Sequence, residues 1–231
     1  MTASNPDKST KAPRLILDGV FAFPPNRETM GGTAYFIVEN DSSDQAANIL
    51  VDCPAWTDTT QAFLADQGGV RWLFLTHRGA IAQVKKMLQT LSCQVIIQEQ
   101  EAYLLPNLAP RTFHQTDILS PQSRVFWTPG YSPGSACLYH QRYGGILFSG
   151  RHLLPTPTGQ LQPLRFAKTF HWPRQLSSLE QILADFSPET LQHVCPGANT
   201  GFLRGAGSVK PAYQQLQKLD LNRLRETQVL L

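Results

Sequence analysis

Hydrophobic and polar positions divide the chain into a first group of β segments, a β–α stretch and a second group of β segments. Apolar runs bounded by turn residues predict strands over 14–23, 32–39 and 48–52. Pro24-Pro25 ends the first run, and the turn residues 40–44 separate the second from the third. A start rich in hairpins favours antiparallel sheet.

The next stretch alternates strand and helix. Thr57 or Asp58 can cap a helix that runs to about Gln67, before Gly68-Gly69. The mostly apolar run 70–76 predicts a buried strand, and residues 93–98 predict another. Between them, apolar residues at 3-4-3 spacing predict one helical face, namely Ile81, Val84, Leu88 and Leu91. This alternation indicates an α/β sheet with helices packed outside it.

The second half returns to short β segments. Strands are predicted over 124–128, 136–140 and 145–149, with Gly144-Gly145 as the turn of the last hairpin. Residues 153–168 contain prolines and glutamines and are expected to form a loop. The remaining elements are a helix with Leu176, Leu179, Leu183 and Phe186 on one face, a short strand at 193–195, and a helix from about Pro211.

Composition narrows the class of protein. The 231 residues, 42% of them hydrophobic, are ample for a sizeable core. A formal net charge of +3 without a run of basic residues argues against nucleic acid as a partner. We expect residues 1–13 to be a disordered tail, with a short transit-type leader as the alternative, and residues 14–231 to form one domain of two similar halves.

Cysteine usage and hydropathy bear on the compartment. The four cysteines are widely spaced and form no C-x-x-C pair, which is typical of reduced thiols in a cytoplasmic protein. No apolar stretch approaches the roughly 18 residues that a membrane span requires. The sequence therefore predicts a cytoplasmic protein without a membrane span.

Five short segments occur in an order that resembles the metallo-β-lactamase-fold superfamily. They are Leu50-Val-Asp52, Thr76-His77, Thr128-Pro-Gly-Tyr-Ser-Pro-Gly-Ser135, Leu147-Phe-Ser-Gly150 and Val194-Cys-Pro-Gly197. Each is weak alone, and their order and spacing carry the resemblance, which covers about 15–199. It implies an α/β, four-layer αββα sandwich, with two mixed sheets face to face and helices on both outer faces.

The same resemblance implies that most of the superfamily's metal ligands are missing from this chain. Metal-binding members carry H-x-H-x-D-H at the second segment, a His after Thr-Pro-Gly, an Asp after Ser-Gly and a His after Pro-Gly. In this chain six of those seven positions are substituted, at Gly79, Ile81, Ala82, Tyr131, Arg151 and Ala198, and only His77 is kept.

Coordination chemistry turns this loss into a functional prediction. A catalytic zinc needs about three protein ligands, and a single histidine facing an arginine does not supply them. Without the metal there is no activated water and no route to metal-assisted hydrolysis. We therefore expect no cofactor and no metal site of the superfamily's kind. A new site built from His77, His152 and a cysteine is conceivable, but their spacing does not favour it.

The residual site has its own candidates. Arg151 either fills the vacated cavity and pairs with Asp52, or helps to bind an anion with Arg78 and His77. Tyr131 either packs as a core aromatic, which we favour, or lines a ligand site. His152 is expected to be an exposed loop histidine.

Gly130-Tyr-Ser132-Pro133-Gly134 matches the G-x-S-x-G nucleophile elbow. In that motif the residue after the serine donates its backbone N–H to the oxyanion, and Pro133 has none. A strand rather than a helix is also predicted to follow. We therefore do not assign Ser132 as a nucleophile.

Three functional hypotheses remain. The favoured one is a non-catalytic pseudoenzyme with a binding, scaffold or regulatory role, whose partner is an unidentified protein or an anionic small molecule. The second is a metal-independent hydrolase that acts on an anionic small molecule through the residual pocket. The third is a hydrolase of the usual metal-dependent kind, which fold alone does not establish.

Overall fold

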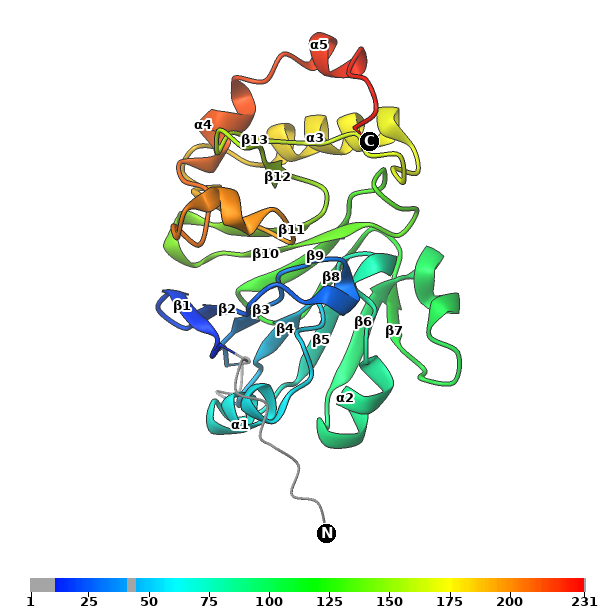
Figure 1. The fold of residues 1–231 in the computed structure, drawn as a ribbon, viewed down its shortest axis with the longest axis vertical. Coiled ribbons are helices and arrows are strands. Elements are labelled where there is room, and N and C mark those ends of the chain that lie inside the picture. Colours follow the sequence, from blue (N-terminus) through cyan, green and yellow to red (C-terminus); the bar gives the residue numbers. More distant parts are fainter. Residues whose placement is uncertain (1–10, 41–44, 231) are drawn as a thin grey trace.

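The computed structural model describes residues 11–40 and 45–230. Of the predicted tail, residues 1–13, positions 1–10 lie outside the described residues. The described chain forms two β-sheets that pack face to face, with helices on each outer face (Figure 1).

The first sheet runs in chain order. It contains β1 (Arg14–Leu17), β2 (Val20–Ala22), β3 (Tyr35–Ile37), β4 (Ile49–Val51), β5 (Trp72–Leu75), β6 (Gln94–Gln98) and β7 (Arg111–Phe113). Neighbours from β1 to β4 are antiparallel, and neighbours from β4 to β7 are parallel. The change from hairpins to the β–α stretch is therefore the change from antiparallel to parallel pairing.

The second sheet has the order β14 (His193–Pro196), β11 (Ile146–Gly150), β10 (Ala136–His140), β9 (Ser123–Trp127) and β8 (Thr116–Ile118). Strand β14 is parallel to β11, and the other neighbours are antiparallel. Both sheets are thus mixed. A separate small ribbon joins β12 (Leu154–Pro155) to β13 (Leu161–Gln162).

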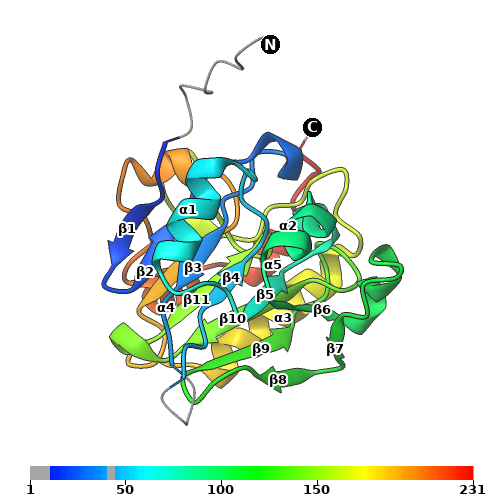
Figure 2. The ribbon, with the colours of Figure 1, turned by 90° about the horizontal axis from the view of Figure 1, so that it is seen from below.

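Helices α1 (Asp58–Asp66) and α2 (Val84–Thr90) cover the outer face of the first sheet (Figure 2). Helices α3 (Trp172–Asp185), α4 (Ala212–Gln217) and α5 (Leu221–Arg225) cover the second. Short 3-10 turns complete the path, at η1 (Arg27–Thr29), η2 (Arg78–Ala80), η3 (Glu99–Leu104), η4 (Arg142–Gly144) and η5 (Thr200–Leu203). The predicted αββα sandwich is confirmed.

Three apolar clusters stabilise these layers. The central cluster lies between the sheets and includes Tyr35, Phe74 and Phe148. The other two bury the inner faces of the helices, around Leu64 on one side and Leu179 on the other. Burial of these side chains, at roughly 25 cal/mol per Å2 of apolar surface, is the main term that favours this packing.

Several local predictions need correction. The run 14–23 is not one strand, because Gly19 at φ 71° turns it into the β1–β2 hairpin. The predicted loop 153–168 contains the β12–β13 ribbon. Strands β7 and β8 are not among the predicted strands, and the C-terminal helix is two helices, α4 and α5.

Candidate functional site at the edge of the sandwich

The five segments behind the family resemblance meet at one edge of the sandwich. The N–H of Ala136 donates to the Thr76 carbonyl at 2.8 Å, and that of Gly197 donates to the Gly150 carbonyl at 2.6 Å. Gly150 adopts φ 51°, and a Cβ there would lie 2.4 Å from Thr76 Oγ1. The Thr76 side chain therefore leaves no room for a side chain at Gly150.

Asp52, Thr76 and His77 form a buried hydrogen-bonded chain. The Thr76 N–H donates to Asp52 Oδ1 at 2.8 Å, and the Thr76 hydroxyl donates to Asp52 Oδ2 at 2.8 Å. His77 Nδ1 lies 2.9 Å from the same hydroxyl oxygen. When Asp52 is ionised it can only accept, so the Thr76 hydroxyl proton is directed at Asp52, and His77 Nδ1 carries its proton and donates to Thr76. His77 Nε2 is then an unprotonated acceptor.

The surroundings of His77 enclose that nitrogen. His77 Nε2 is buried and has no hydrogen-bond partner among the described residues. The ring of Tyr131 meets the imidazole edge-on, with centroids 5.0 Å apart. A Cβ at Gly79 would lie 3.1 Å from Nε2 and 3.0 Å from Met30 Cε. Met30, Gly79 and Tyr131 therefore line the way to His77.

Burial sets the ionisation of both titratable groups. It lowers the pKa of His77 to about 3, with smaller contributions from the charges of Arg151 and Arg78. It also raises the pKa of Asp52 to about 7, although the Thr76 hydrogen bonds and the Arg151 charge oppose that shift. His77 is thus neutral at pH 7, and Asp52 changes charge near that pH.

Arg151 takes backbone partners. Its Nη2 donates to the carbonyls of Thr29 at 3.2 Å and Met30 at 2.8 Å, and its guanidinium carbon lies 5.9 Å from the Tyr131 ring centroid. Within the described residues it forms no ion pair with Asp52, so that predicted pairing is wrong. Met30 adopts a left-handed φ of 55° at the end of η1, in the same loop that supplies the two carbonyls. Arg151 therefore ties the 29–30 loop to the end of β11.

The other candidate site residues are Tyr131, Arg78 and His152. Tyr131 is 7% exposed and packs as a core aromatic, as favoured, and Arg78 is exposed on η2. The prediction for His152 is wrong, because it is 1% exposed and Gln175 of α3 donates to its carbonyl at 3.0 Å. Burial lowers the pKa of His152 to about 4.

These residues do not fit the superfamily's metal. In the described part of the chain no group of three or more His, Cys, Asp or Glu side chains is placed to hold a metal ion. Asp52 is already bonded to Thr76, and Ala198 packs against apolar residues. One neutral imidazole beside a guanidinium is not a dication site.

Ser132 is not placed as a nucleophile. It is fully buried, and its hydroxyl lies 2.9 Å from the Ser135 hydroxyl. The N–H of Ser132 is also bonded to Ser135 Oγ, at 2.8 Å. Together with Pro133, these contacts define a closed turn.

A second chain of the same kind lies at the opposite end of the sandwich. The Ser123 hydroxyl donates to Glu39 Oε2 at 2.7 Å and lies 2.9 Å from His140 Nδ1. Ser120 also donates to Glu39. Burial raises the pKa of Glu39 and lowers that of His140 to about 4. This chain links the first sheet to the second.

Contacts between distant segments at this edge were not predicted from the sequence. The sequence did not identify the Thr76 hydroxyl as the link between Asp52 and His77, or the loop at Thr29 and Met30 as the partner of Arg151. A threonine directly before the retained histidine was the available signal for the first. No local pattern pointed to the second.

Comparison with known proteins supports the fold. Neither protein-family models nor curated proteins gave a match to the sequence. Among solved structures, a β-lactamase domain protein of Burkholderia ambifaria has a TM-score of 0.60 at 17% identity, covering 95% of this chain and 77% of its own. A metallo-β-lactamase superfamily protein of Sulfolobus tokodaii has a TM-score of 0.57 at 14% identity, covering 92% and 90%.

The metallo-β-lactamase FIM-1 of Pseudomonas aeruginosa, solved in a mono-zinc form, has a TM-score of 0.57 at 17% identity, covering 92% of this chain and 97% of its own. At these identities the likeness establishes the fold and not the activity. The chain therefore has the metallo-β-lactamase fold. None of its described helices is long and apolar enough to cross a membrane.

Proposed function

We propose that the protein is a non-catalytic metallo-β-lactamase-fold protein, a pseudoenzyme with a binding or regulatory role in the cytoplasm. The observation that carries this proposal is the environment of Arg151. The Arg151 guanidinium is stacked on Tyr131 and bonded to the carbonyls of Thr29 and Met30. By the resemblance to the superfamily, this position carries a metal-bridging carboxylate in metal-binding members. The positive charge of the guanidinium also disfavours a dication beside His77.

Metal content tests this proposal directly. Protein purified without chelator and dialysed against zinc should hold far less than the roughly one metal ion per chain of a catalytic site. The Arg151→Asp variant is the matched comparison, because it removes the repelling charge and adds a carboxylate oxygen. About one zinc or iron per wild-type chain, lost on His77→Gln, would overturn the proposal.

A second function is favoured by one specific observation, the unpartnered Nε2 of His77. A neutral imidazole whose Nδ1–H is held by a hydroxyl, which is itself bonded to a carboxylate, has an orientation similar to that of a general base. With Arg151 and Arg78 nearby, it supports a metal-independent hydrolase of an anionic small molecule. Met30 Cε and His77 Nε2 both border the space beside Gly79.

Turnover of anionic esters in the presence of a chelator separates the two functions. A hydrolase that uses His77 as its base should lose about 10²-fold or more in rate on His77→Gln. His140→Gln is the matched control, because it removes the imidazole of the similar chain at the other end. An equal, low background rate in all three proteins supports the non-catalytic function.

A further inference from the structure

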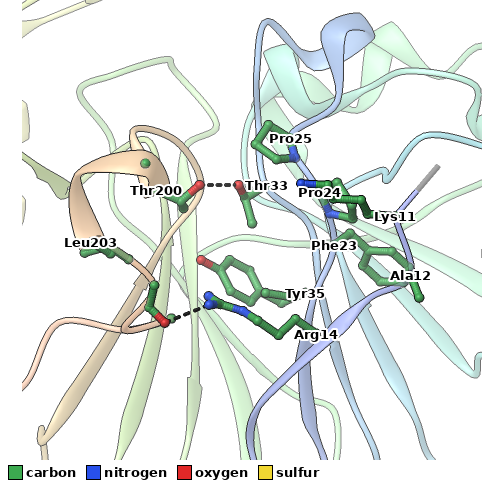
Figure 3. A pocket seen from close by; sticks show the side chains of 14 residues that line it. Lys11, Ala12, Arg14, Phe23, Pro24, Pro25, Thr33, Tyr35, Thr200 and Leu203 are labelled. Carbon is green, nitrogen blue, oxygen red and sulfur yellow. Dashed lines mark hydrogen bonds between the residues drawn. The ribbon is translucent and has the colours of Figure 1, made fainter. Parts of the chain in front are cut away.

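A cavity of about 440 Å3 lies between the β1–β2 hairpin, the start of β3 and the segment 200–207 (Figure 3). Its size is within the range of roughly 300–1,000 Å3 that is typical of small-molecule sites. None of its lining residues is one of the seven superfamily ligand positions or a member of the His77 chain. It is therefore a separate candidate site.

The charged side chains described around this cavity are cations. Lys11 and Arg14 line it, and its described lining residues include no Asp or Glu. Arg14 Nη1 donates to the Gly205 carbonyl at 2.7 Å, which holds the guanidinium against the 200–207 segment (Figure 3). The remaining N–H groups of that guanidinium can donate to an anion.

Hydroxyl groups form one wall. Thr33 and Tyr35 are 3% and 1% exposed and yet line the cavity. The hydroxyls of Thr33 and Thr200 lie 3.0 Å apart, and this bond uses one of their two protons. Tyr35 donates its proton to the Pro196 carbonyl at 2.8 Å. The threonine pair thus keeps one O–H donor for an acceptor group, such as a carboxylate oxygen.

The rest of the wall is apolar. It contains Ala22, Phe23, Pro24 and Pro25 on one side and Leu203 of the 200–207 segment, near Thr200, on the other (Figure 3). Such a wall fits a hydrocarbon body, because burying apolar surface is favourable and needs no hydrogen-bond partner. A fully polar anion such as inorganic phosphate leaves this wall unused.

The neighbouring cavity is less suited to an anion. It measures about 530 Å3 and shares Lys11, Phe23, Pro24 and Pro25 with the first. Its lining includes Arg27 and also Glu28, whose carboxylate repels a negative ligand and offsets one of the two cations. The charge distribution therefore favours the cavity of Figure 3.

We propose that this cavity binds a small carboxylic acid with a hydrocarbon body. The carboxylate lies between Arg14, Lys11 and the Thr33–Thr200 pair, and the hydrocarbon body lies against Phe23, Pro24 and Leu203. The proposal is independent of the proposed function, because a metal at His77 would change neither the lining residues nor their charge.

Calorimetric titration with octanoate tests it, with octanol and inorganic phosphate as comparisons. Octanoate should bind saturably, and both comparisons should bind at least about tenfold more weakly, a difference of about 1.4 kcal/mol. Affinity for octanoate should also fall as salt rises, since both cations are exposed. Phosphate that binds as tightly as octanoate, or octanoate that shows no saturable binding, would overturn the proposal.

Two variants locate the ligand. Arg14→Gln should weaken octanoate binding at least about tenfold through loss of the charge-assisted hydrogen bonds. A Cβ at Gly201 meets no atom within 4 Å, so Gly201→Leu should fill the entrance without changing the unfolding midpoint of the free protein. Lys85→Gln, an exposed cation on α2, is the control and should bind as the wild type does. Unchanged affinity in Arg14→Gln and Gly201→Leu would place the ligand elsewhere and refute the assignment.

Discussion

Asp52→Asn isolates the energetic effect of the buried carboxylate that follows β4. An asparagine of the same shape keeps an oxygen for the Thr76 N–H, and its amide can donate to the Thr76 hydroxyl oxygen. The hydroxyl proton then turns toward His77 Nδ1, so the chain stays fully bonded in the opposite direction. The substitution therefore removes the charge with little change in packing.

The magnitude follows from the pKa shift. The Asp52 pKa rises from 3.8 to about 7 on folding, so the native state binds the proton more tightly than the unfolded state. Native stability therefore falls as pH rises from about 4 to about 7, by about 4 kcal/mol at most. Relative to wild type, Asp52→Asn should be of equal stability near pH 4 and more stable by about 2–4 kcal/mol at pH 8.

Urea unfolding, followed by tryptophan fluorescence at intervals from pH 4 to pH 8, measures this difference. Taking the difference between variant and wild type removes the opposing acid effect of the buried histidines, which both proteins share. Asp58→Asn, at the exposed first turn of α1, controls for net charge. If Asp52→Asn is instead destabilised by the same amount at every pH, the Thr76 hydrogen bonds outweigh burial and the reasoning is wrong.

Three further outcomes are expected. Arg151→Met should lower stability by about 1–3 kcal/mol in urea unfolding, through loss of the bonds to Thr29 and Met30, and should raise the NMR titration midpoint of Asp52. The wild type should lose up to about 3 kcal/mol of stability through His152 as pH falls from 6.5 to 4, and His152→Phe should abolish this loss, measured as a smaller dependence of urea unfolding on acid pH. Glu101→Gln should raise stability at pH 8 by about 1 kcal/mol or more, because neither oxygen of this buried carboxylate has a partner among the described residues; a lower urea midpoint would contradict this.

The sequence predicted those parts of the fold whose signals are local. Buried strands such as β5 are continuous apolar runs, and α1 begins at the predicted Thr57 cap, whose side chain accepts from Thr60. Strands β7 and β8 are three residues long and carry few apolar positions, and Ile118 of β8 is 71% exposed. Pairing with neighbouring strands, rather than an apolar period, defines them.

The residues of the candidate site could be selected from the sequence, but their contacts could not. The substituted ligand positions could be read from motif spacing, and the neighbourhood of His77, Tyr131 and Arg151 is as expected. The partners of Arg151 are 121 and 122 residues away in sequence. His152 is buried through contact with α3. Such long-range contacts have no signature in the residues that flank either partner.

The chain of Glu39, Ser123 and His140 has a consequence for recognising enzymes by geometry. Because β3 and β4 are antiparallel, Glu39 and Asp52 lie at opposite ends of the sheet, and each end holds a carboxylate, a hydroxyl and an imidazole in line. In a catalytic triad the imidazole lies between the hydroxyl and the carboxylate, whereas in both of these chains the hydroxyl lies between the carboxylate and the imidazole. In both, the hydroxyl proton points to the carboxylate rather than to the imidazole, which is the reverse of an activated nucleophile. The order of the three groups and the direction of the hydroxyl proton therefore distinguish both chains from a catalytic triad, although they contain the same types of residue.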